Sequence, residues 1–351
     1  MSEPDWEDQT LVHSIRVDLV DPVTLSQSRG ALSGVVATGK LSLQYYSDTR
    51  ASASVTTSVA AGESDGWDGT AAMRIVHVVG DWSETLFTGY VTACPWEEQS
   101  GQVETTYTLN STLWAMGQQV VANAYTIGSK GKGLAALRTA FKRTSRTYSV
   151  AGSALDHVYA RATVYEGSKT WLSVAHDVAN TCGDRLDVAP DGRVTVSKYV
   201  APASRTPRYD LALDGADGPF FGSVSGEDSR ADVPGRVVVI STDGDDTVVG
   251  TATVSTSSAY HPGRRGWTLD MLVEESDLDP FTAEAATALA RKRLALNSAP
   301  AYSMDVDMLY RPLAAGDVLR IERDGEVGRW AVSTATLDLH YFTWSLELKE
   351  V

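Results

Sequence analysis

The side chains that most often do chemistry are sparse in this sequence and lie far apart along it. None of the six histidines belongs to an HExxH or HxH motif, so their spacing predicts no zinc site. His176 and Asp177 are adjacent on a predicted helix, where successive side chains point about 100° apart, so they cannot form one site. We expect His176 to be a partly exposed helix residue. The histidines are His13, His77, His157, His176, His261 and His340.

Neither cysteine and no serine has the sequence context of an activated nucleophile. Cys94 ends a predicted strand directly before Pro95 and Trp96, whereas a catalytic thiol needs a nearby histidine or helix N-terminus. We therefore interpret Cys94 as a packing residue. The stretch GSVSG, from Gly222 to Gly226, lacks the G-x-S-x-G order of a nucleophile elbow. The sequence predicts no catalytic residue and no cofactor.

Two clusters of aspartates surround predicted turns. Neither cluster has the loop spacing and final glutamate of an EF-hand, so turn formation explains them better than calcium binding. Paired carboxylates for glycoside cleavage stay an open alternative, because the sequence cannot place two of them at the separation that this chemistry needs. The clusters are Asp184, Asp187 and Asp191, and Asp243, Asp245 and Asp246.

One basic segment stands out in an otherwise acidic chain. It begins with the glycine-rich run from Gly128 to Gly133, which lacks the G-x-x-x-x-G-K-[ST] pattern of a phosphate-binding loop. Two interpretations stay open for its cations: a solvated helix face, or a docking surface for an acidic neighbour. The cations, with no acid among them, are Lys130, Lys132, Arg138, Lys142, Arg143 and Arg146.

Tryptophans are spread over the whole chain. A sugar-binding platform would gather several of them in one loop region, whereas scattered aromatics more often fill cores and subunit seams. The distribution favours packing and assembly. The tryptophans considered are Trp67, Trp82, Trp96, Trp114, Trp171, Trp267, Trp330 and Trp344.

The composition bounds the class of protein. The chain has 351 residues, is 43% hydrophobic and carries a formal charge of −15, which argues against a surface that binds duplex DNA. Two cysteines without a CxxC motif indicate folding in a reducing compartment. The acidic first residues do not look like a signal peptide, and no apolar run is long enough for a membrane span. We expect synthesis in the cytoplasm.

Hydrophobic periodicity divides the chain into three parts. Residues 11–115 contain short strands rich in Val, Thr and Tyr, typical of an antiparallel barrel or sandwich. Residues 120–200 combine two amphipathic helices with a hairpin that turns at Asp191 and Gly192, and Gly183 is placed to end a helix. The last part has a helix over 281–297, capped by Thr282 and stopped near Pro300, followed by four strands.

The last strand alternates apolar and polar residues, so we expect Phe342, Trp344, Leu346 and Leu348 to share one face. Hairpin turns are predicted at Gly244 and Asp324. No internal repeat is evident in the sequence.

The order of these parts, with four loose motifs, resembles the baseplate hub proteins of bacteriophage tails and related contractile injection machines. The motifs are the G-x-R-L-x-V-x-x-D-G-x-V hairpin from Gly183 to Val194, the P-G-R-V-V-V strand from Pro234 to Val239, the A-R-K-R-L helix from Ala290 to Leu294, and the L-x-x-G-D-V-L-R-I strand from Leu313 to Ile321.

The resemblance implies a fold and an organisation. We expect a mainly β protein in which two tube-protein-like antiparallel β-barrel domains flank a small α+β domain. The implied domains are 1–118, 119–217 and 218–351, with the C-terminal helix packed on the second barrel.

The resemblance also implies a function. We expect a non-enzymatic hub at the virion tail tip: a homotrimeric ring that adapts the hexameric tail tube to a three-fold tip and encloses the DNA channel. Its partners would be the tail tube or distal tail protein and a spike or fibre protein, with a tape measure protein as a further candidate and phage DNA only in transit. The alternative is a tail-tip cell-wall hydrolase or carbohydrate-binding module.

Overall fold

The structure is a computed structural model, and it describes residues 4–6, 10–26, 28–213, 220–228, 233–243, 245–275, 278, 281–297, 302–323 and 325–351. Three residues that carried sequence predictions lie outside these ranges. They are Gly244 and Asp324, each in a predicted hairpin turn, and Pro300, the predicted stop of the C-terminal helix.

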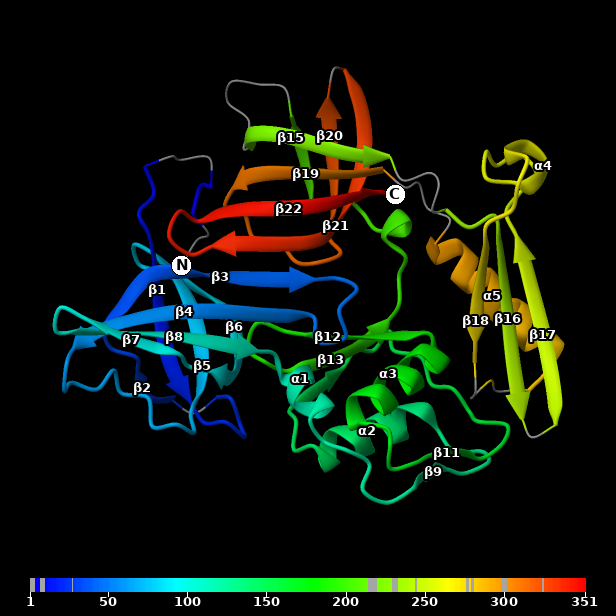
Figure 1. Ribbon diagram of the computed structural model, residues 1–351, viewed down its shortest axis with the longest axis horizontal. Coiled ribbons are helices and arrows are strands. Elements are labelled where there is room, and N and C mark those ends of the chain that lie inside the picture. The colour runs from blue at the N-terminus through cyan, green and yellow to red at the C-terminus, as the bar shows by residue number, and fades with distance from the viewer. Residues whose placement is uncertain are drawn as a thin grey trace.

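The protein is mainly β, as predicted, and most of its strands belong to one sheet of fourteen strands (Figure 1). The first half of this sheet contains β1 (His13–Val20), β2 (Ser28–Ala31), β3 (Val35–Gln44), β4 (Ala51–Ala60), β5 (Ala72–Val79), β6 (Trp82–Ala93), β7 (Trp96–Gln99) and β8 (Gln102–Asn110). The second half contains β14 (Tyr209–Ala212), β15 (Phe220–Asp228), β19 (Tyr302–Leu309), β20 (Val318–Arg323), β21 (Glu326–Asp338) and β22 (Thr343–Glu350).

The two halves repeat one topology. The main strands pair in the order β3-β4-β8-β6-β5-β1 in the first half and β15-β19-β22-β21-β20-β14 in the second. Numbered by their place in the chain, both orders read 2-3-6-5-4-1. The halves differ in direction at one pairing, because β1 is antiparallel to β5 whereas β14 is parallel to β20. The chain therefore contains the same strand arrangement twice.

The halves are joined edge to edge. β21 of the second half pairs with β3 of the first, so the strands run from β15 near the top of Figure 1 to β8 and β7 below without a break. Alternate residues of these strands point into one hydrophobic core that both halves share. In β22, Trp344, Leu346 and Leu348 are buried, which confirms the alternation predicted for the last strand.

A helical unit lies to the lower right of the first half in Figure 1. It contains α1 (Thr112–Gly117), β9 (Tyr125–Ile127), α2 (Gly133–Arg143), β10 (Tyr148–Val150), β11 (Thr163–Tyr165), α3 (Trp171–Cys182), β12 (Asp184–Val188), β13 (Val194–Lys198) and the 3-10 turn η1 (Pro202–Ser204). Thr170 and Ser173 form a capping box at the start of α3, and Gly183 ends it at φ 78°, in the left-handed conformation predicted for it. The predicted hairpin is formed by β12 and β13.

A third unit is inserted between β15 and β19. It contains β16 (Arg236–Asp243), β17 (Asp246–Thr253), α4 (Pro262–Arg265), β18 (Asp270–Glu274) and α5 (Ala283–Asn297). Thr282 caps α5 as predicted, with the Ala285 N–H donating to its hydroxyl oxygen over 3.2 Å.

The predicted packing of this C-terminal helix on the second barrel is wrong. Ala286 and Ala290 of α5 are buried against Val237 and Val239 of β16, and Gly250 of β17 brings the strand close to the helix backbone. The apolar stripe of α5 therefore covers the small sheet β17-β16-β18, at the right of Figure 1.

Candidate assembly surface

One face of the joined sheet is polar across both halves. The residues between the buried positions of these strands are mostly serine, threonine, asparagine and acids, and all of them point to the face opposite the core. One row of paired residues crosses six strands: Asp307 on β19, Ser345, Thr336, Ser42, Ser52 and Asn110 on β8. The duplicated topology thus produces a single continuous polar surface.

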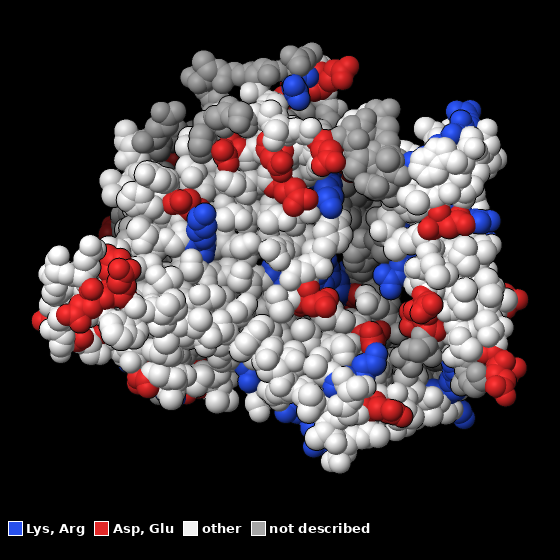
Figure 2. Space-filling model, in the orientation of Figure 1, with Lys and Arg blue, Asp and Glu red and all other residues white. Residues whose placement is uncertain are grey.

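The carboxylates of this face gather on the second half. Ser345 donates to the Asp307 carboxylate over 2.6 Å, and Thr334 donates to that of Glu347 over 3.0 Å. Figure 2 shows red side chains over β15, β19 and β22 and mainly uncharged residues over β3 and β4. Carboxylates repel phosphate, so the second half of this face disfavours binding of a polyanion.

The joint between the halves buries a pair of leucines. Leu337 on β21 pairs with Leu41 on β3, and they are 0% and 1% exposed. Two residue pairs further on, the Leu339 N–H donates to the Gly39 carbonyl over 3.0 Å. The joint therefore combines main-chain hydrogen bonds with a dry contact beneath the polar face.

Below the joint, side chains of the second half cover the first. Leu41, Leu86 and Phe87 of the first half line the same cavity as Tyr310, Leu313 and Trp344 of the second. The Tyr310 hydroxyl also donates to the carboxylate of Glu84. The second half thus seals the open side of the first with aromatic and aliphatic residues.

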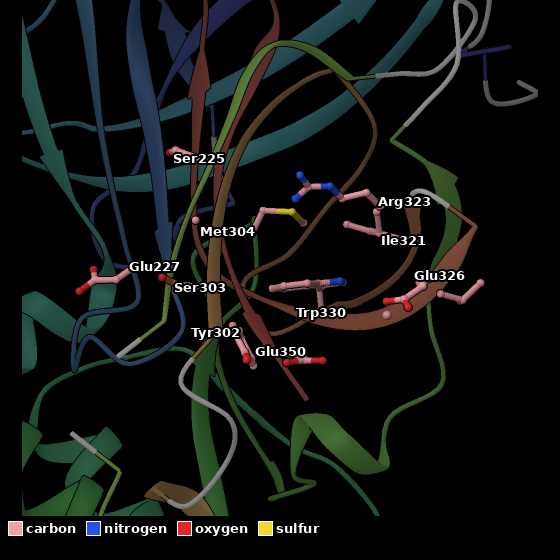
Figure 3. A pocket seen from close by; sticks show the side chains of 13 residues that line it. Ser225, Glu227, Tyr302, Ser303, Met304, Ile321, Arg323, Glu326, Trp330 and Glu350 are labelled. Atoms are coloured by element: carbon pink, nitrogen blue, oxygen red, sulfur yellow. The ribbon is translucent and has the colours of Figure 1, made fainter. Parts of the chain in front are cut away.

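The corresponding side of the second half is open. A pocket of about 540 Å³ lies between β15 and β19 on one side and β20 and β21 on the other (Figure 3). The side chains of Met304, Ile321 and Trp330 line its interior, and Glu326 and Glu350 lie near its rim. Tyr310 and Trp344 cover this side of the first half. In the described part of the chain, no side chains from another sheet unit cover the equivalent side of the second half.

Both ends of the joined sheet carry open edges. β15 pairs only with β19, and β7 pairs only with β8, among the strands that the structure describes. Trp96 on β7 is 68% exposed. Cys94 is also exposed, so its interpretation as a packing residue is wrong: it lies between β6 and β7 on this edge, where no strand covers it.

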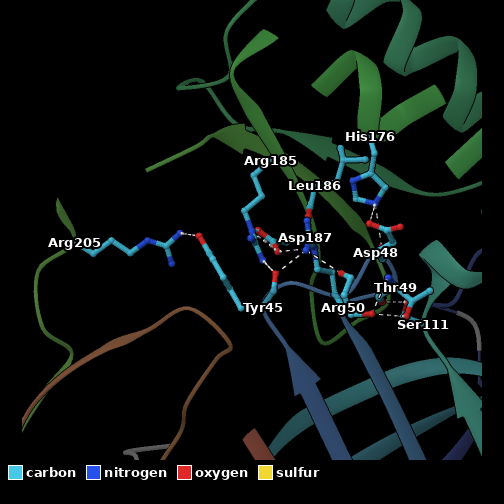
Figure 4. Close-up of polar contacts among 11 residues, drawn as sticks. Tyr45, Asp48, Thr49, Arg50, Ser111, His176, Arg185, Leu186, Asp187 and Arg205 are labelled. Carbon is cyan, nitrogen blue, oxygen red and sulfur yellow. Dashed lines mark hydrogen bonds and ion pairs between the residues drawn. The ribbon is translucent and has the colours of Figure 1, made fainter. Parts of the chain in front are cut away.

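The helical unit is held to the sheet by a polar junction around Tyr45 (Figure 4). The Arg185 guanidinium lies 3.6 Å from the centre of the Tyr45 ring, and Arg205 donates to the Tyr45 hydroxyl over 2.8 Å. Arg50 donates to the carbonyls of Tyr45 over 2.6 Å and Leu186 over 2.9 Å. Burial and the nearby Arg185 lower the pKa of Arg50. This junction fixes the helical unit at one end of the β3–β4 hairpin.

His176 belongs to the same junction. Its Nε2 lies 3.1 Å from the Asp48 carbonyl, and its side chain is only 14% exposed. Burial lowers its pKa below the ordinary value. His176 is thus a partly exposed helix residue, as expected, although the β3–β4 turn covers much of this face of α3.

Two histidines meet at the seam between the halves. His13 Nδ1 lies 2.9 Å from His77 Nε2, and Phe342 of the second half stacks on both rings. On its other side, His77 Nδ1 lies 3.6 Å from the Glu84 carboxylate. Burial and the neighbouring His77 lower the pKa of His13. The sequence does not predict this contact, because the two histidines lie 64 positions apart.

The predicted basic patch divides into exposed and engaged residues. Arg138, Lys142 and Arg143 are exposed on α2, and Lys130 is exposed in the loop before it. Lys132 lies 3.6 Å from the Asp156 carboxylate. Arg146 is half-buried and donates to the Tyr90 hydroxyl, so it ties α2 to β6. The exposed members leave the docking interpretation as a proposal.

The described residues hold neither a metal-ligand cluster nor a membrane-spanning helix. They contain no group of three His, Cys, Asp or Glu residues arranged to hold a metal ion. Likewise, no helix in the described ranges is long and apolar enough to cross a membrane.

Comparison with known proteins identifies the fold. No protein-family model matches the sequence, and no curated protein sequence does. Among solved structures, a tail protein from Neisseria meningitidis aligns with 96% of this chain and 97% of its own, at a TM-score of 0.70 and 13% identity. The 43 kDa tail protein of prophage MuSo2 from Shewanella oneidensis aligns over 95% and 97%, at 0.67 and 9% identity.

A third structure extends the likeness beyond phages. A type VI secretion component of Escherichia coli, itself described as similar to the phage T4 tail proteins gp27 and gp5, aligns with 97% of this chain and 77% of its own, at a TM-score of 0.50 and 8% identity. These likenesses confirm, at the level of the fold, the resemblance inferred from the sequence. The chain has the fold of phage tail proteins.

Proposed function

We propose that this protein is a structural hub of a phage tail, acting as a trimeric ring between the tail tube and the host-facing tip. The observation that carries the proposal is the doubled 2-3-6-5-4-1 strand order. A ring of three such chains presents six similar sheet units, so one of its faces matches a six-fold tube while the assembly keeps three-fold symmetry.

In this ring the polar face of the joined sheet lines the channel. Closing the sheet on itself removes its open edges, which would otherwise favour aggregation. The carboxylates on β19 and β22, Asp307 and Glu347 among them, then face the channel and repel the phosphates of DNA in transit.

The remaining surfaces are available for other tail proteins. The exposed cations of α2, Lys142 and Arg143 among them, form a positively charged surface outside the sheet, which suits an acidic partner. We assign the tube or distal tail protein to one end of the ring and a spike or fibre protein to the other. No step of this role requires a catalytic residue.

The proposal is tested by electron microscopy of the chain assembled with its tail neighbours. A three-fold ring with six similar lobes around a channel is the expected result. A compact particle without a ring would contradict it, and assays of cell-wall and polysaccharide cleavage would then address the hydrolase alternative.

A further inference from the structure

The joint inside the chain pairs the fifth main strand of one half with the second main strand of the other. The corresponding strand positions have open edges at the ends of the joined sheet. β21 and β3 are the fifth and second main strands of their halves. The fifth strand of the first half is β6, which β7 continues along β8, and the second strand of the second half is β15. In the described part of the chain, β7 and β15 each have one partner strand.

The two halves also share a register. The β6–β8 pairing shifts after Val91, and the β21–β22 pairing shifts after Val332. Trp96 lies as far beyond Val91 as Leu337 lies beyond Val332, so Trp96 occupies the position of Leu337. From the two shifts, matching rows of paired residues cross the sheet: Val91, Leu109, Ala53 and Leu41 in the first half, and Val332, Leu348, Met304 and Gly226 in the second.

Gly226 therefore occupies the position of Leu41. Inside the chain, Leu337 pairs with Leu41 and both are buried. At the open edges, the equivalent residues are Trp96, which is exposed, and Gly226, which has no side chain. A large residue opposite a small one fills the space of two leucines, so Trp96 and Gly226 have complementary sizes for the same joint.

The main chain of β7 is oriented for a further strand. The Pro95 carbonyl accepts from the Thr106 N–H of β8 over 2.9 Å, so the backbone polar groups of Pro95 point toward β8. The N–H and C=O groups of one residue point to the same side of a strand, and those of its neighbours to the other. The N–H and C=O groups of Cys94 and Trp96 therefore point to the open edge. Pro95 has no N–H, but its polar groups point to β8, so a strand added at the open edge loses no hydrogen bond through Pro95.

The open pocket of the second half lies beside the other edge. Gly226, Val327 and Gly328 line it, at the positions that Leu41, Leu86 and Phe87 occupy in the first half. In the first half these positions are covered by side chains from the neighbouring sheet unit. The pocket in Figure 3 is thus a socket whose counterpart inside the chain is lined by side chains of both halves.

We propose that β15 of one copy pairs with β7 of the next, antiparallel and in the register that sets Gly226 opposite Trp96. This rests on the proposed ring and names its interface. The edges lie at opposite ends of the joined sheet (Figure 1), so the contact is head-to-tail and closes after three copies. The Trp96 side chain enters the socket beside Gly226, where it stands in for Leu337.

Disulfide crosslinking tests the register directly. Glu97 and Ser225 take the places of Asp338 and Lys40, a pair without mutual hydrogen bonds, whose Cβ atoms lie about 5 Å apart in such ladders. The full chain carrying E97C and S225C, with the exposed native thiol removed by C94S, is oxidised at high concentration and run on a denaturing gel. The matched control carries E98C with S225C, because Glu98 points to the opposite face of the sheet.

The expected result is a crosslinked species of three chains with E97C/S225C and at least tenfold less of it with E98C/S225C. The native mass of the unoxidised chain distinguishes failure of the proposed interface from failure of the proposed ring. A trimer that gives no E97C/S225C crosslink, or equal crosslinking in both variants, overturns the interface and leaves the ring. A chain that stays monomeric without any crosslink overturns both, and a ladder beyond three chains overturns ring closure while supporting the strand pairing.

Discussion

Trp96 and Leu337 occupy equivalent positions in the two halves of the sheet, but Leu337 is 0% exposed and Trp96 is 68% exposed. Leu337 is covered because β3 continues the sheet beside it. Trp96 lies on an open edge. A large apolar side chain left in water where its counterpart is buried marks a surface that assembly covers.

Removing the Trp96 side chain is expected to weaken self-association without destabilising the monomer. Tryptophans at the centre of interfaces commonly contribute about 2 kcal/mol, which corresponds to roughly 30-fold in the association constant. Sedimentation of Trp96→Ala against the natural chain measures this. Trp267→Ala is the control, since Trp267 is also exposed, at 49%, but lies outside the joined sheet. Equal effects from the two substitutions would contradict the assignment.

Gly316 is expected to be indispensable to the Tyr45 junction. A Cβ there would lie 2.2 Å from the Tyr45 ring, and the residue has φ 87°. Gly325 has a similar φ of 80° and open space around its Cβ position. Gly325→Ala should therefore cost only backbone strain, about 1 kcal/mol, and Gly316→Ala at least about 2 kcal/mol more from overlap with the ring. Urea unfolding of both variants checks this, and equal losses would show that the junction tolerates the added atom.

Stability should fall as the pH drops below the ordinary histidine value of 6.5, partly through His13. Burial and His77 lower the pKa of folded His13, so between the two pKa values the unfolded chain binds more protons. The contribution of neutral His13 to the free energy of unfolding is full above pH 6.5 and is lost below it. The slope is at most about 1.4 kcal/mol per pH unit for one proton.

Urea unfolding at several pH values, with His13→Gln beside the exposed His340→Gln, measures the contribution of His13. The first variant should have the shallower pH dependence, and His340→Gln should keep that of the natural chain. Burial also lowers the pKa of His176, so both variants keep a residual pH dependence of stability with the same sign. An unchanged slope in His13→Gln would exclude His13 as a contributor.

The basic surface of α2 gives a salt-dependent prediction. Reversing two exposed charges in Lys142→Glu/Arg143→Glu should reduce particle assembly at physiological salt without changing the unfolding midpoint, since both side chains are exposed. Arg264→Glu, on the exposed α4 turn, is the control. An unchanged particle yield for the α2 variant would leave only the interpretation as a solvated helix face.

The sequence predicted the elements that carry their own local signal. Alternation in the last strand marked Trp344, Leu346 and Leu348 as buried, and Gly183 marked the end of α3. Thr282 marked the start of α5, but a helix cap does not show which sheet covers the helix. Packing partners depend on residues distant in the chain, so the helix was assigned to the wrong sheet.

The candidate interface could not be read from the sequence. The repeat exists in strand order, while equivalent positions hold dissimilar residues such as Leu41 and Gly226, so no internal repeat is visible. Cys94 and Trp96 have the composition of a packed strand end, and only the topology shows that no strand lies beside them. The His13–His77 contact likewise arises from the pairing of β1 with β5.

The most direct test of the ring is an electron-microscopy map of the chain in its assembled state. We expect a three-fold ring whose inner wall is one closed sheet, with density crossing each chain boundary between β15 and β7. A ring held together elsewhere would contradict the interface, and a particle with no ring would contradict the proposed function.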